Sequence, residues 1–253
     1  ELQYGVAYRD AADDPSTTSA SQRHPGVGRD DSARSMDLGS VGVPVPKPFD
    51  DPQNARGAKL LAVTAAKVIE RGEAPSMTRV QGWEGERDAI VNPERSTVLD
   101  PESLVDLTAS VVDGVVVPPA GDWAVFGFWM RDCTQGVTSF LDRAAAVAAT
   151  EYLDEHQFGA ANLAAFERVG TEWFEDSLEY NADSLFWTSD LLDRFQRRHG
   201  YDVTRYLPVL FAHGMCRYWV PNTEPVADFE LADGSGPRLR ADYYRLITDL
   251  YIE

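Results

Sequence analysis

The amino-acid sequence predicts an α/β fold, made of part of a parallel barrel into which an antiparallel β module is inserted. Two observations lead to this prediction. Between residues of about 60 and 132, β-branched runs flank an Asp-Gly pair, which is a strong hairpin signal. Between residues 142 and 200 the order is helix, strand, acidic loop and helix, as in an α/β unit. In parallel barrels the chemistry collects on the loops that follow the strands.

The composition limits the classes of partner. The chain has 253 residues, 43% of them apolar, which is enough for a sizeable core. Its 41 acidic and 23 basic residues give a net charge of -18, which argues against nucleic acid or an anionic membrane and favours neutral or cationic partners. No apolar run reaches the roughly 18 residues that span a bilayer. Cys133 and Cys216 have no metal-ligand spacing and are interpreted as buried thiols in preference to a disulfide.

Residues 1–58 are predicted to be a barrel segment with a long mobile loop. The opening "ELQYGVAYRD" alternates as a strand does, and it carries neither a methionine nor a signal peptide, so we expect an excerpt of a longer fold. Residues 10–35 are rich in Ser, Thr, Asp, Gly and Pro, which is typical of a solvated loop. The prolines of "VGVPVPKPFDDPQN" favour an extended path.

Residues 59–132 are predicted to form the inserted module, an antiparallel β-sandwich-like unit. "AKLLAVTAAKVIE" fits either a helix or a buried strand, because short apolar runs do not separate the two. "VVDGVVV" places a hairpin turn at Asp113 and Gly114. "GDWAVFGFWMR" alternates bulky side chains at Trp123, Val125 and Trp129, as expected of a strand.

Residues 133–253 are predicted to be the barrel segment that carries the site. "LDRAAAVAATEYLDEHQFG" reads as a helix that Asp142 caps and Gly159 ends, and "AANLAAFERVG" as a shorter one that leads through Gly170 into the strand "TEWFEDS". At the C-terminal end, "RADYYRLITDLYIE" has apolar residues at helical spacing.

The run "TSDLLDRFQRRHGYD" contains a helix with clear start and stop signals. Thr188 or Ser189 is expected to be its N-cap, and Asp190 and Arg194 are spaced i to i+4. Gly200 follows its last turn, as a C-terminal glycine does.

Just before this helix, "FEDSLEYNADSLFWTSD" places carboxylates among aromatic side chains. Cleavage of a glycosidic bond needs one carboxylic acid to protonate the leaving oxygen and a second carboxylate as nucleophile or base. Aromatic neighbours raise the pKa of such an acid and stack on sugar rings. Glu179 is therefore the first candidate for the general acid, and Asp176 is the second.

A structural interpretation of the same acids remains open. Asp176 and Ser177 could cap the following turn while Glu179 pairs with an arginine. Other chemistries have less support. The four histidines are scattered without zinc-ligand spacing, Ser177 lacks the glycines of a nucleophile elbow, and neither GxGxxG nor a Walker loop is present.

The stretch from Phe174 to Leu210 resembles the catalytic-barrel segment of the α-L-rhamnosidases of glycoside hydrolase family 106. That segment has an "F-x-DS-x-E" strand end, then "WT", a helix ending in "RRGYD", and "YLP". The counterparts here are Phe174, Asp176, Ser177, Glu179, Trp187, Thr188, the run from Arg197 to Asp202 with His199 interposed, and Tyr206 to Pro208. The likeness extends more loosely over about four-fifths of the chain, and complete family members are several times longer.

The resemblance implies part of a (β/α)8 TIM-type barrel from a secreted or periplasmic inverting glycosidase. Such an enzyme releases terminal L-rhamnose from glycans or glycosides, with a calcium ion contacting the sugar hydroxyls. Glu179 falls on the acidic position of the motif and is expected to be the catalytic acid, with Asp176, Tyr180 and Trp187 contacting the carbohydrate substrate. Neither the second catalytic carboxylate nor the calcium ligands can be matched. The alternatives are a noncatalytic glycan-binding module and a degenerate fragment of such an enzyme.

Overall fold

The computed structural model describes residues 2–9, 42–48, 57–73, 76–82, 85–91, 95–119, 121–131, 141–170, 184–212 and 226–253. For residues 76–82 and 85–91 only the backbone is described.

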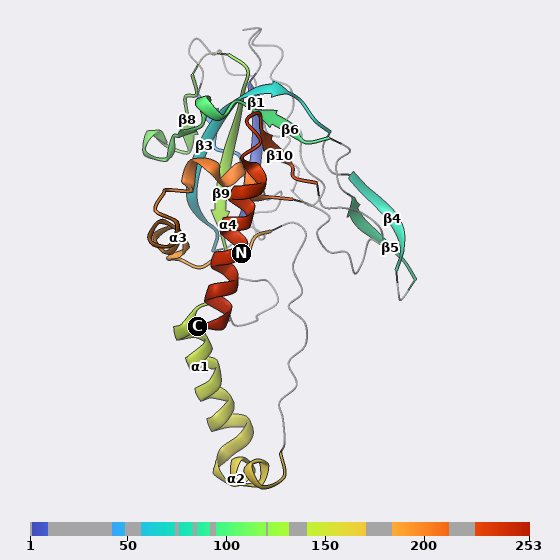
Figure 1. Cartoon of the computed structure of the whole chain (residues 1–253), viewed down its shortest axis with the longest axis vertical. Helices are drawn as coiled ribbons and strands as arrows, with labels where there is room; N and C mark the ends of the chain where they lie inside the picture. The colour runs from blue at the N-terminus through green and yellow to red at the C-terminus, as the bar shows by residue number, and fades with distance from the viewer. Residues whose placement is uncertain are drawn as a thin grey trace.

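A six-stranded sheet is the centre of the described structure (Figure 1). Its main path runs through five strands, in the spatial order β1 (Leu2–Arg9), β9 (Trp123–Met130), β3 (Lys59–Glu70), β6 (Thr97–Leu99) and β10 (Phe229–Leu231). The short strand β7 (Val105–Asp106) pairs with β3 beside this path. Neighbours along the path are antiparallel, except that β10 runs parallel to β6.

The alternation of side chains along β9 explains why this strand lies inside the sheet. Ala124, Phe126 and Phe128 enter the larger core on one face, while Trp123 and Val125 enter a second core on the other face. All five side chains are buried, because both faces of the strand are covered. The run 59–70, for which the sequence left helix and strand open, is the strand β3 and divides its side chains between the same two cores.

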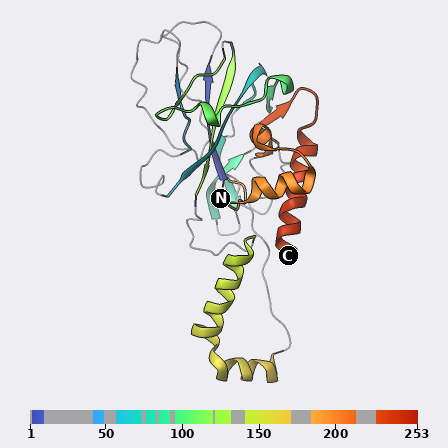
Figure 2. The same cartoon turned by 90° about the vertical axis from the view of Figure 1, so that its left-hand side faces the viewer.

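Helices cover the face of the sheet with the larger core. They are α3 (Leu191–His199), the 3-10 segment η4 (Thr204–Leu210) and α4 (Gly236–Ile252). Figure 2 shows α3 and α4 on one side of the strands. Phe195 of α3 and Tyr243 of α4 are fully or almost fully buried in this core. The predicted C-terminal helix is thus confirmed as α4.

The strands β2 (Val43–Pro44) and β8 (Val115–Val116) form a small two-stranded sheet. Val116 of this sheet belongs to the smaller core. The segment that continues from β2 passes very close to the main sheet. A Cβ atom on Gly127 would lie 2.2 Å from the Pro46 carbonyl oxygen, and one on Gly5 would lie 2.7 Å from the Lys47 backbone nitrogen. Gly5 and Gly127 face each other in the β1–β9 register. This close approach therefore requires glycine on both strands, and the Trp129 indole nitrogen fixes it by donating to the Pro46 oxygen at 2.8 Å.

The predicted hairpin turn is confirmed. Asp113 and Gly114 have φ angles of 51° and 76°, which is the left-handed pair that an Asp-Gly turn adopts. Val112 and Val115 exchange both backbone hydrogen bonds across it, each at 2.9 Å. Two 3-10 turns precede it, η1 (Pro101–Ser103) and η2 (Thr108–Ser110).

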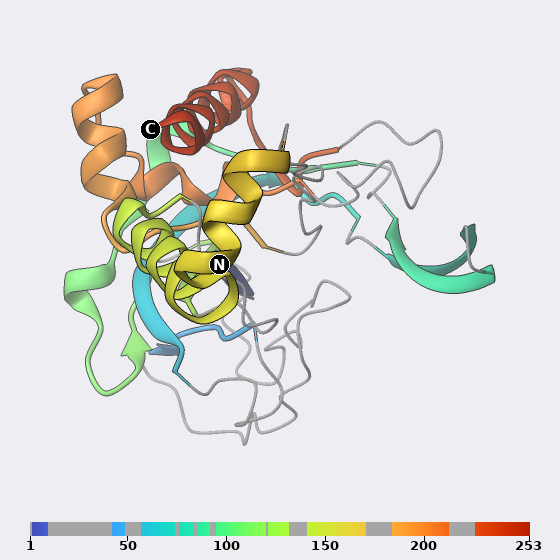
Figure 3. The same cartoon turned by 90° about the horizontal axis from the view of Figure 1, so that it is seen from below.

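Two parts of the described chain lie outside this packed body. The first is a helical arm made of α1 (Arg143–Leu153), the π-helical turn η3 (Asp154–Phe158) and α2 (Gly159–Val169), in which no residue is buried. The second is a ribbon of β4 (Ser76–Gly82) and β5 (Gly85–Val91). Figures 1 and 3 show the ribbon to one side of the main sheet.

The helical arm confirms three sequence predictions. The Asp142 carboxylate caps α1 by accepting from the backbone of Ala144 at 2.9 Å and of Ala145 at 3.3 Å. Gly159 has a φ of 58° and separates η3 from α2. Gly170 follows the last residue of α2.

The main sheet contains strands from all three predicted segments: β1 from 1–58, β3, β6, β7 and β9 from 59–132, and β10 from 133–253. Residues 59–132 are mainly β where they are described, as expected. The described strands form no closed barrel of parallel strands, and the barrel stays a prediction. The predicted loop at 10–35 and strand at 171–177 lie outside the described residues.

Candidate functional site

The predicted site is only partly within the described structure. Asp176, Glu179 and Tyr180 lie in the segment 171–183, outside the described residues, as do Cys133 and Cys216. Trp187 is described. So is the chain on both sides of the segment, namely the end of α2 before it and the residues from Ser184 onward after it.

The chain that follows the acidic segment is fastened to the first strand. The Leu185 backbone nitrogen donates to the Leu2 oxygen at 2.9 Å, and the Leu2 nitrogen donates to the Leu185 oxygen at 2.8 Å. Both side chains are buried in the larger core. One end of the predicted catalytic segment is thus held at the sheet by two backbone hydrogen bonds and an apolar anchor.

Trp187 lies in the core and not on an open surface. Its side chain is 6% exposed and belongs to the larger core, near the start of α3. Its indole nitrogen is buried and has no hydrogen-bond partner among the described residues. A buried indole N–H usually has a partner, because leaving such a donor unpaired costs about 1–3 kcal/mol. The predicted contact of Trp187 with substrate stays a prediction.

The start of α3 differs in one detail from the sequence prediction. The N-cap residue is Asp190, not Thr188 or Ser189. The Thr188 hydroxyl donates to the Asp190 carboxylate at 2.9 Å, and the Arg194 Nε donates to it at 2.7 Å, so the predicted i to i+4 pair is confirmed. Partial burial tends to raise the pKa of Asp190, but the hydrogen bonds from Arg194 and Thr188 outweigh it and hold this pKa below its usual value.

The end of α3 shows what the "RRHGYD" run does structurally. Gly200 takes a left-handed conformation with φ of 79° and ends the helix, as predicted. The Tyr201 hydroxyl then donates to the Asp242 carboxylate on α4 at 3.0 Å, and Asp202 accepts from the backbone and hydroxyl of Thr204 at the start of η4. The side chain of His199 is also nearly buried, with Nδ1 3.8 Å from Asp242. These residues of the motif join α3 to α4.

The structure reveals a buried acid that sequence reasoning missed. Asp228, immediately before β10, is 2% exposed, and its carboxylate accepts a hydrogen bond from the Tyr4 hydroxyl at 2.7 Å. The backbone of Asp228 bridges two elements, donating to Phe211 and accepting from Thr97. Burial, and then the negative charge of Asp228, raise the pKa of Tyr4 well above its usual value. Tyr4 and Asp228 are 224 positions apart, so no local pattern could have identified the pair.

Raised tyrosine pKa values predict a loss of stability at alkaline pH. Burial raises the pKa of Tyr4 and of Tyr8, so the native state keeps protons that the unfolded chain loses above pH of about 10. The stabilisation is complete below that pH and is lost as pH rises towards the native pKa values, at up to about 1.4 kcal/mol per pH unit for Tyr4. Urea midpoints measured from pH 8 to 11 should therefore fall steeply above pH 10.

Tyr4→Phe should make this alkaline fall shallower, while lowering stability at neutral pH because Asp228 loses a donor. Tyr152→Phe is the matched control, because Tyr152 lies exposed on α1. An alkaline profile of Tyr4→Phe that superimposes on the parent profile would contradict the assignment.

The described residues contain no group of three or more His, Cys, Asp or Glu side chains that could hold a metal ion. The implied calcium ion therefore finds no fitting ligand set in this part of the chain. No described helix is long and apolar enough to cross a membrane.

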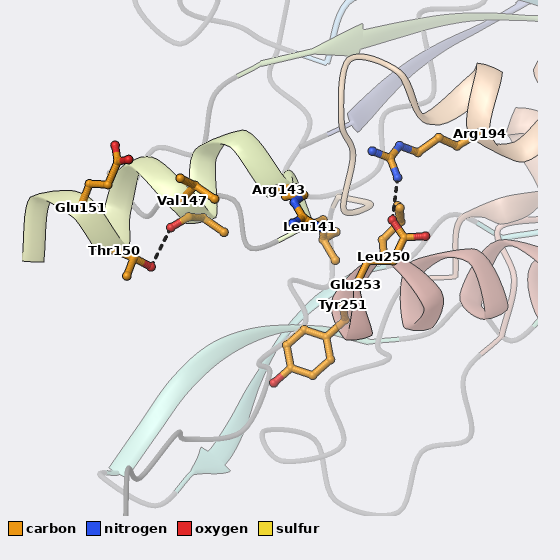
Figure 4. A pocket seen from close by; sticks show the side chains of 10 residues that line it. Leu141, Arg143, Val147, Thr150, Glu151, Arg194, Leu250, Tyr251 and Glu253 are labelled. Carbon is orange, nitrogen blue, oxygen red and sulfur yellow. Dashed lines mark hydrogen bonds and ion pairs between the residues drawn. The ribbon is translucent and has the colours of Figure 1, made fainter. Parts of the chain in front are cut away.

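A hollow of about 410 Å³ lies between α1, Arg194 of α3 and the C-terminal end of α4 (Figure 4). The Arg194 guanidinium crosses from α3 to the Glu253 carboxylate at 3.0 Å along one side of it. The lining residues are Leu141, Arg143, Ala146, Val147, Thr150, Glu151, Arg194, Leu250, Tyr251 and Glu253. None of them belongs to the predicted site.

Comparisons with known proteins give one likeness. No family model and no curated protein matches the chain. Among solved structures, the chain is similar to the rhamnosidase from Novosphingobium sp. PP1Y, with a TM-score of 0.35 and 14% sequence identity over 99% of this chain and 30% of that chain. The chain thus spans less than a third of that enzyme's length. A TM-score this low carries no argument about fold or activity, so membership of glycoside hydrolase family 106 stays a resemblance.

Proposed function

We propose that this chain is the part of an inverting α-L-rhamnosidase that carries the general acid. The observation that supports the proposal is the run from Phe174 to Pro208, in which acids among aromatic residues precede "WT", a helix and "YLP". The part of this run that is described contains the expected helix α3, ended by Gly200 and joined to α4 through Tyr201. A packed helix directly after the acidic segment gives a catalytic loop a rigid support.

In the proposed reaction, Glu179 gives its proton to the glycosidic oxygen as the bond between that oxygen and the anomeric carbon breaks. A water molecule attacks the anomeric carbon from the opposite face, and a second carboxylate takes a proton from this water, which inverts the configuration. The two carboxyl groups of such a site lie roughly 6.5–9.5 Å apart, so that the water fits between them. Phe174 and Tyr180, close in sequence, supply apolar surroundings that keep the acid protonated.

We assign no described residue as the base. The two acids that are buried in the described structure, Asp228 and Asp242, accept hydrogen bonds from Tyr4 and Tyr201 inside the packed body. A carboxylate held in this way cannot reach a water on a sugar ring. A calcium ion bound in such an enzyme would coordinate sugar hydroxyls and orient the ring.

The test is hydrolysis of a chromogenic α-L-rhamnoside by the whole protein that contains this chain, with and without a chelator. We expect release of L-rhamnose whose first-formed anomer, followed by NMR, has inverted configuration. A chelator should lower activity if the calcium role is correct, and added calcium should restore it. Failure to cleave α-L-rhamnosides when the protein is folded would refute the proposed substrate. Retained configuration would refute the inverting mechanism.

A further inference from the structure

A cluster of arginine and tyrosine side chains lies where the end of α3, η4 and α4 meet. Its centre is Asp242 of α4, which is 7% exposed. The Asp242 carboxylate accepts from the Tyr201 hydroxyl at 3.0 Å and from the Arg245 Nη1 at 3.3 Å, and it lies 3.9 Å from the Arg238 Nε. The two arginines are four residues before and three residues after Asp242 on the same helix. One buried carboxylate therefore faces both guanidinium groups.

A third arginine joins this cluster through two tyrosine rings. The Tyr201 ring lies edge to face against the Tyr206 ring, with 6.3 Å between their centres. The Arg205 guanidinium carbon lies 4.7 Å from the centre of the Tyr206 ring, and Nη2 donates to the Tyr206 hydroxyl at 2.5 Å. The cluster thus has three guanidinium groups around one carboxylate. Asp202, next to Tyr201 in the sequence, is engaged by Thr204, and counting it still leaves a positive excess.

The arginines of the cluster keep most of their donors for a ligand. The side chains of Arg238 and Arg245 are 76% and 68% exposed, and Arg205 is also exposed. Each guanidinium has five N–H donors, and one carboxylate can accept only a few of them. Arg238 and Arg245 are seven residues apart on α4, which is about two turns or roughly 10.5 Å along the helix. The cluster therefore offers donors at separate points on a surface.

We propose that this cluster binds an acidic glycan through the carboxylates of its uronate units. Guanidinium groups recognise carboxylates by charge-assisted, paired hydrogen bonds. Arginines that are separated along a helix suit a chain with repeated anionic groups better than one small ion. The partly exposed rings of Tyr201 and Tyr206 add apolar surface of the kind on which sugar rings stack, which favours a glycan over an acidic peptide.

The inference rests on the proposed function for its choice of a glycan. A glycosidase acts on sugar chains, and this surface would hold an acidic part of a chain while another part is cleaved. The net charge of -18 opposes the approach of any polyanion. At about 0.1 M salt, however, the Debye length is about 10 Å, so distant acids are screened while contacts within the cluster are not.

The experiment is a ligand-observed NMR titration of the whole protein that contains this chain, at about 0.1 M salt. Its probes are tetramannuronate, the neutral β-1,4-linked mannotetraose, and tetraglutamate. The first two differ only in the carboxylates, and the third carries carboxylates on a peptide. We expect tetramannuronate to bind, with an affinity that falls as salt is raised. Mannotetraose should not bind detectably, and tetraglutamate should bind more weakly than tetramannuronate.

Arginine variants locate the binding on the protein. The double variant Arg238→Gln with Arg245→Gln should weaken tetramannuronate binding roughly tenfold, as expected for the loss of two exposed ion pairs. Arg205→Gln should weaken it about threefold, and it leaves Asp242 untouched because Arg205 donates to Tyr206. Arg143→Gln is the matched control, because this exposed arginine of α1 lies outside the cluster, and it should change the affinity by less than about twofold. Urea midpoints check that all variants are folded.

The inference is overturned if tetramannuronate does not bind, if mannotetraose or tetraglutamate binds as tightly, or if the cluster variants bind like the parent. Failure here can be told apart from failure of the proposed function. A protein that hydrolyses rhamnosides through Glu179 but does not bind tetramannuronate retains the function and loses the acidic-glycan site. Binding that depends on Arg238 and Arg245 in a protein without hydrolytic activity gives the opposite result.

Discussion

Glu179→Gln is expected to lower the turnover of natural rhamnosides by about 10² to 10⁴, which is the usual contribution of one general acid. Glutamine keeps the shape of the side chain and its ability to form hydrogen bonds, but it has no proton to give to the leaving oxygen. The loss should therefore fall mainly on kcat, with KM nearly unchanged. Steady-state kinetics of the whole protein on a natural glycoside measure both constants.

The leaving group provides the internal control for this prediction. An aryl rhamnoside whose phenol is already a good leaving group needs little protonation, so the variant should hydrolyse it with a much smaller defect. Asp176→Asn changes a neighbouring acid that is assigned to substrate contact, and it should raise KM more than it lowers kcat. An equal defect of Glu179→Gln on both substrate types, with the fold intact, would show that Glu179 positions substrate or a metal and is not the acid.

Local elements of this fold could be predicted where a few neighbouring residues determine the backbone. Asp113 and Gly114 form the expected turn because both accept positive φ angles. Asp142, Gly159 and Gly200 lie at helix boundaries for equally local reasons. The predicted N-cap of α3 was wrong by one or two residues. Asp190 holds this position, and its side chain accepts from Thr188 and Arg194 without making a capping hydrogen bond.

Long-range pairing could not be predicted. The run 59–70 forms a strand because side chains on both of its faces are buried in a core. One core includes helices of the C-terminal third, and the other includes the β2–β8 region. The sequence of that run alone contains neither partner. The Tyr4–Asp228 bond and the Leu2–Leu185 pairing likewise join distant positions. The catalytic roles of Glu179 and Asp176 rest on sequence alone and stay predictions.

Phe126→Ala is expected to destabilise the protein by about 3–5 kcal/mol. This is a large share of the free energy of unfolding of a typical domain, which is roughly 5–15 kcal/mol. Phe126 is fully buried on β9. Its ring meets Phe229 of β10 edge to face at 4.8 Å, and stacks with Phe128 at 6.2 Å. The variant loses both the transfer free energy of the ring and the contacts of the side chains around the cavity.

This cavity would open beside the elements that hold the predicted catalytic segment. Tyr4 of β1 lies 6.4 Å from the Phe126 ring, and Leu2 of the same strand anchors Leu185. Phe126→Leu, which fills much of the space, should cost considerably less, and Tyr152→Ala on the exposed helical arm should stay within about 0.5 kcal/mol of the parent. Urea unfolding measures all three variants. A cost below about 1 kcal/mol for Phe126→Ala would mean that this aromatic cluster does not hold β1, β9 and β10 together.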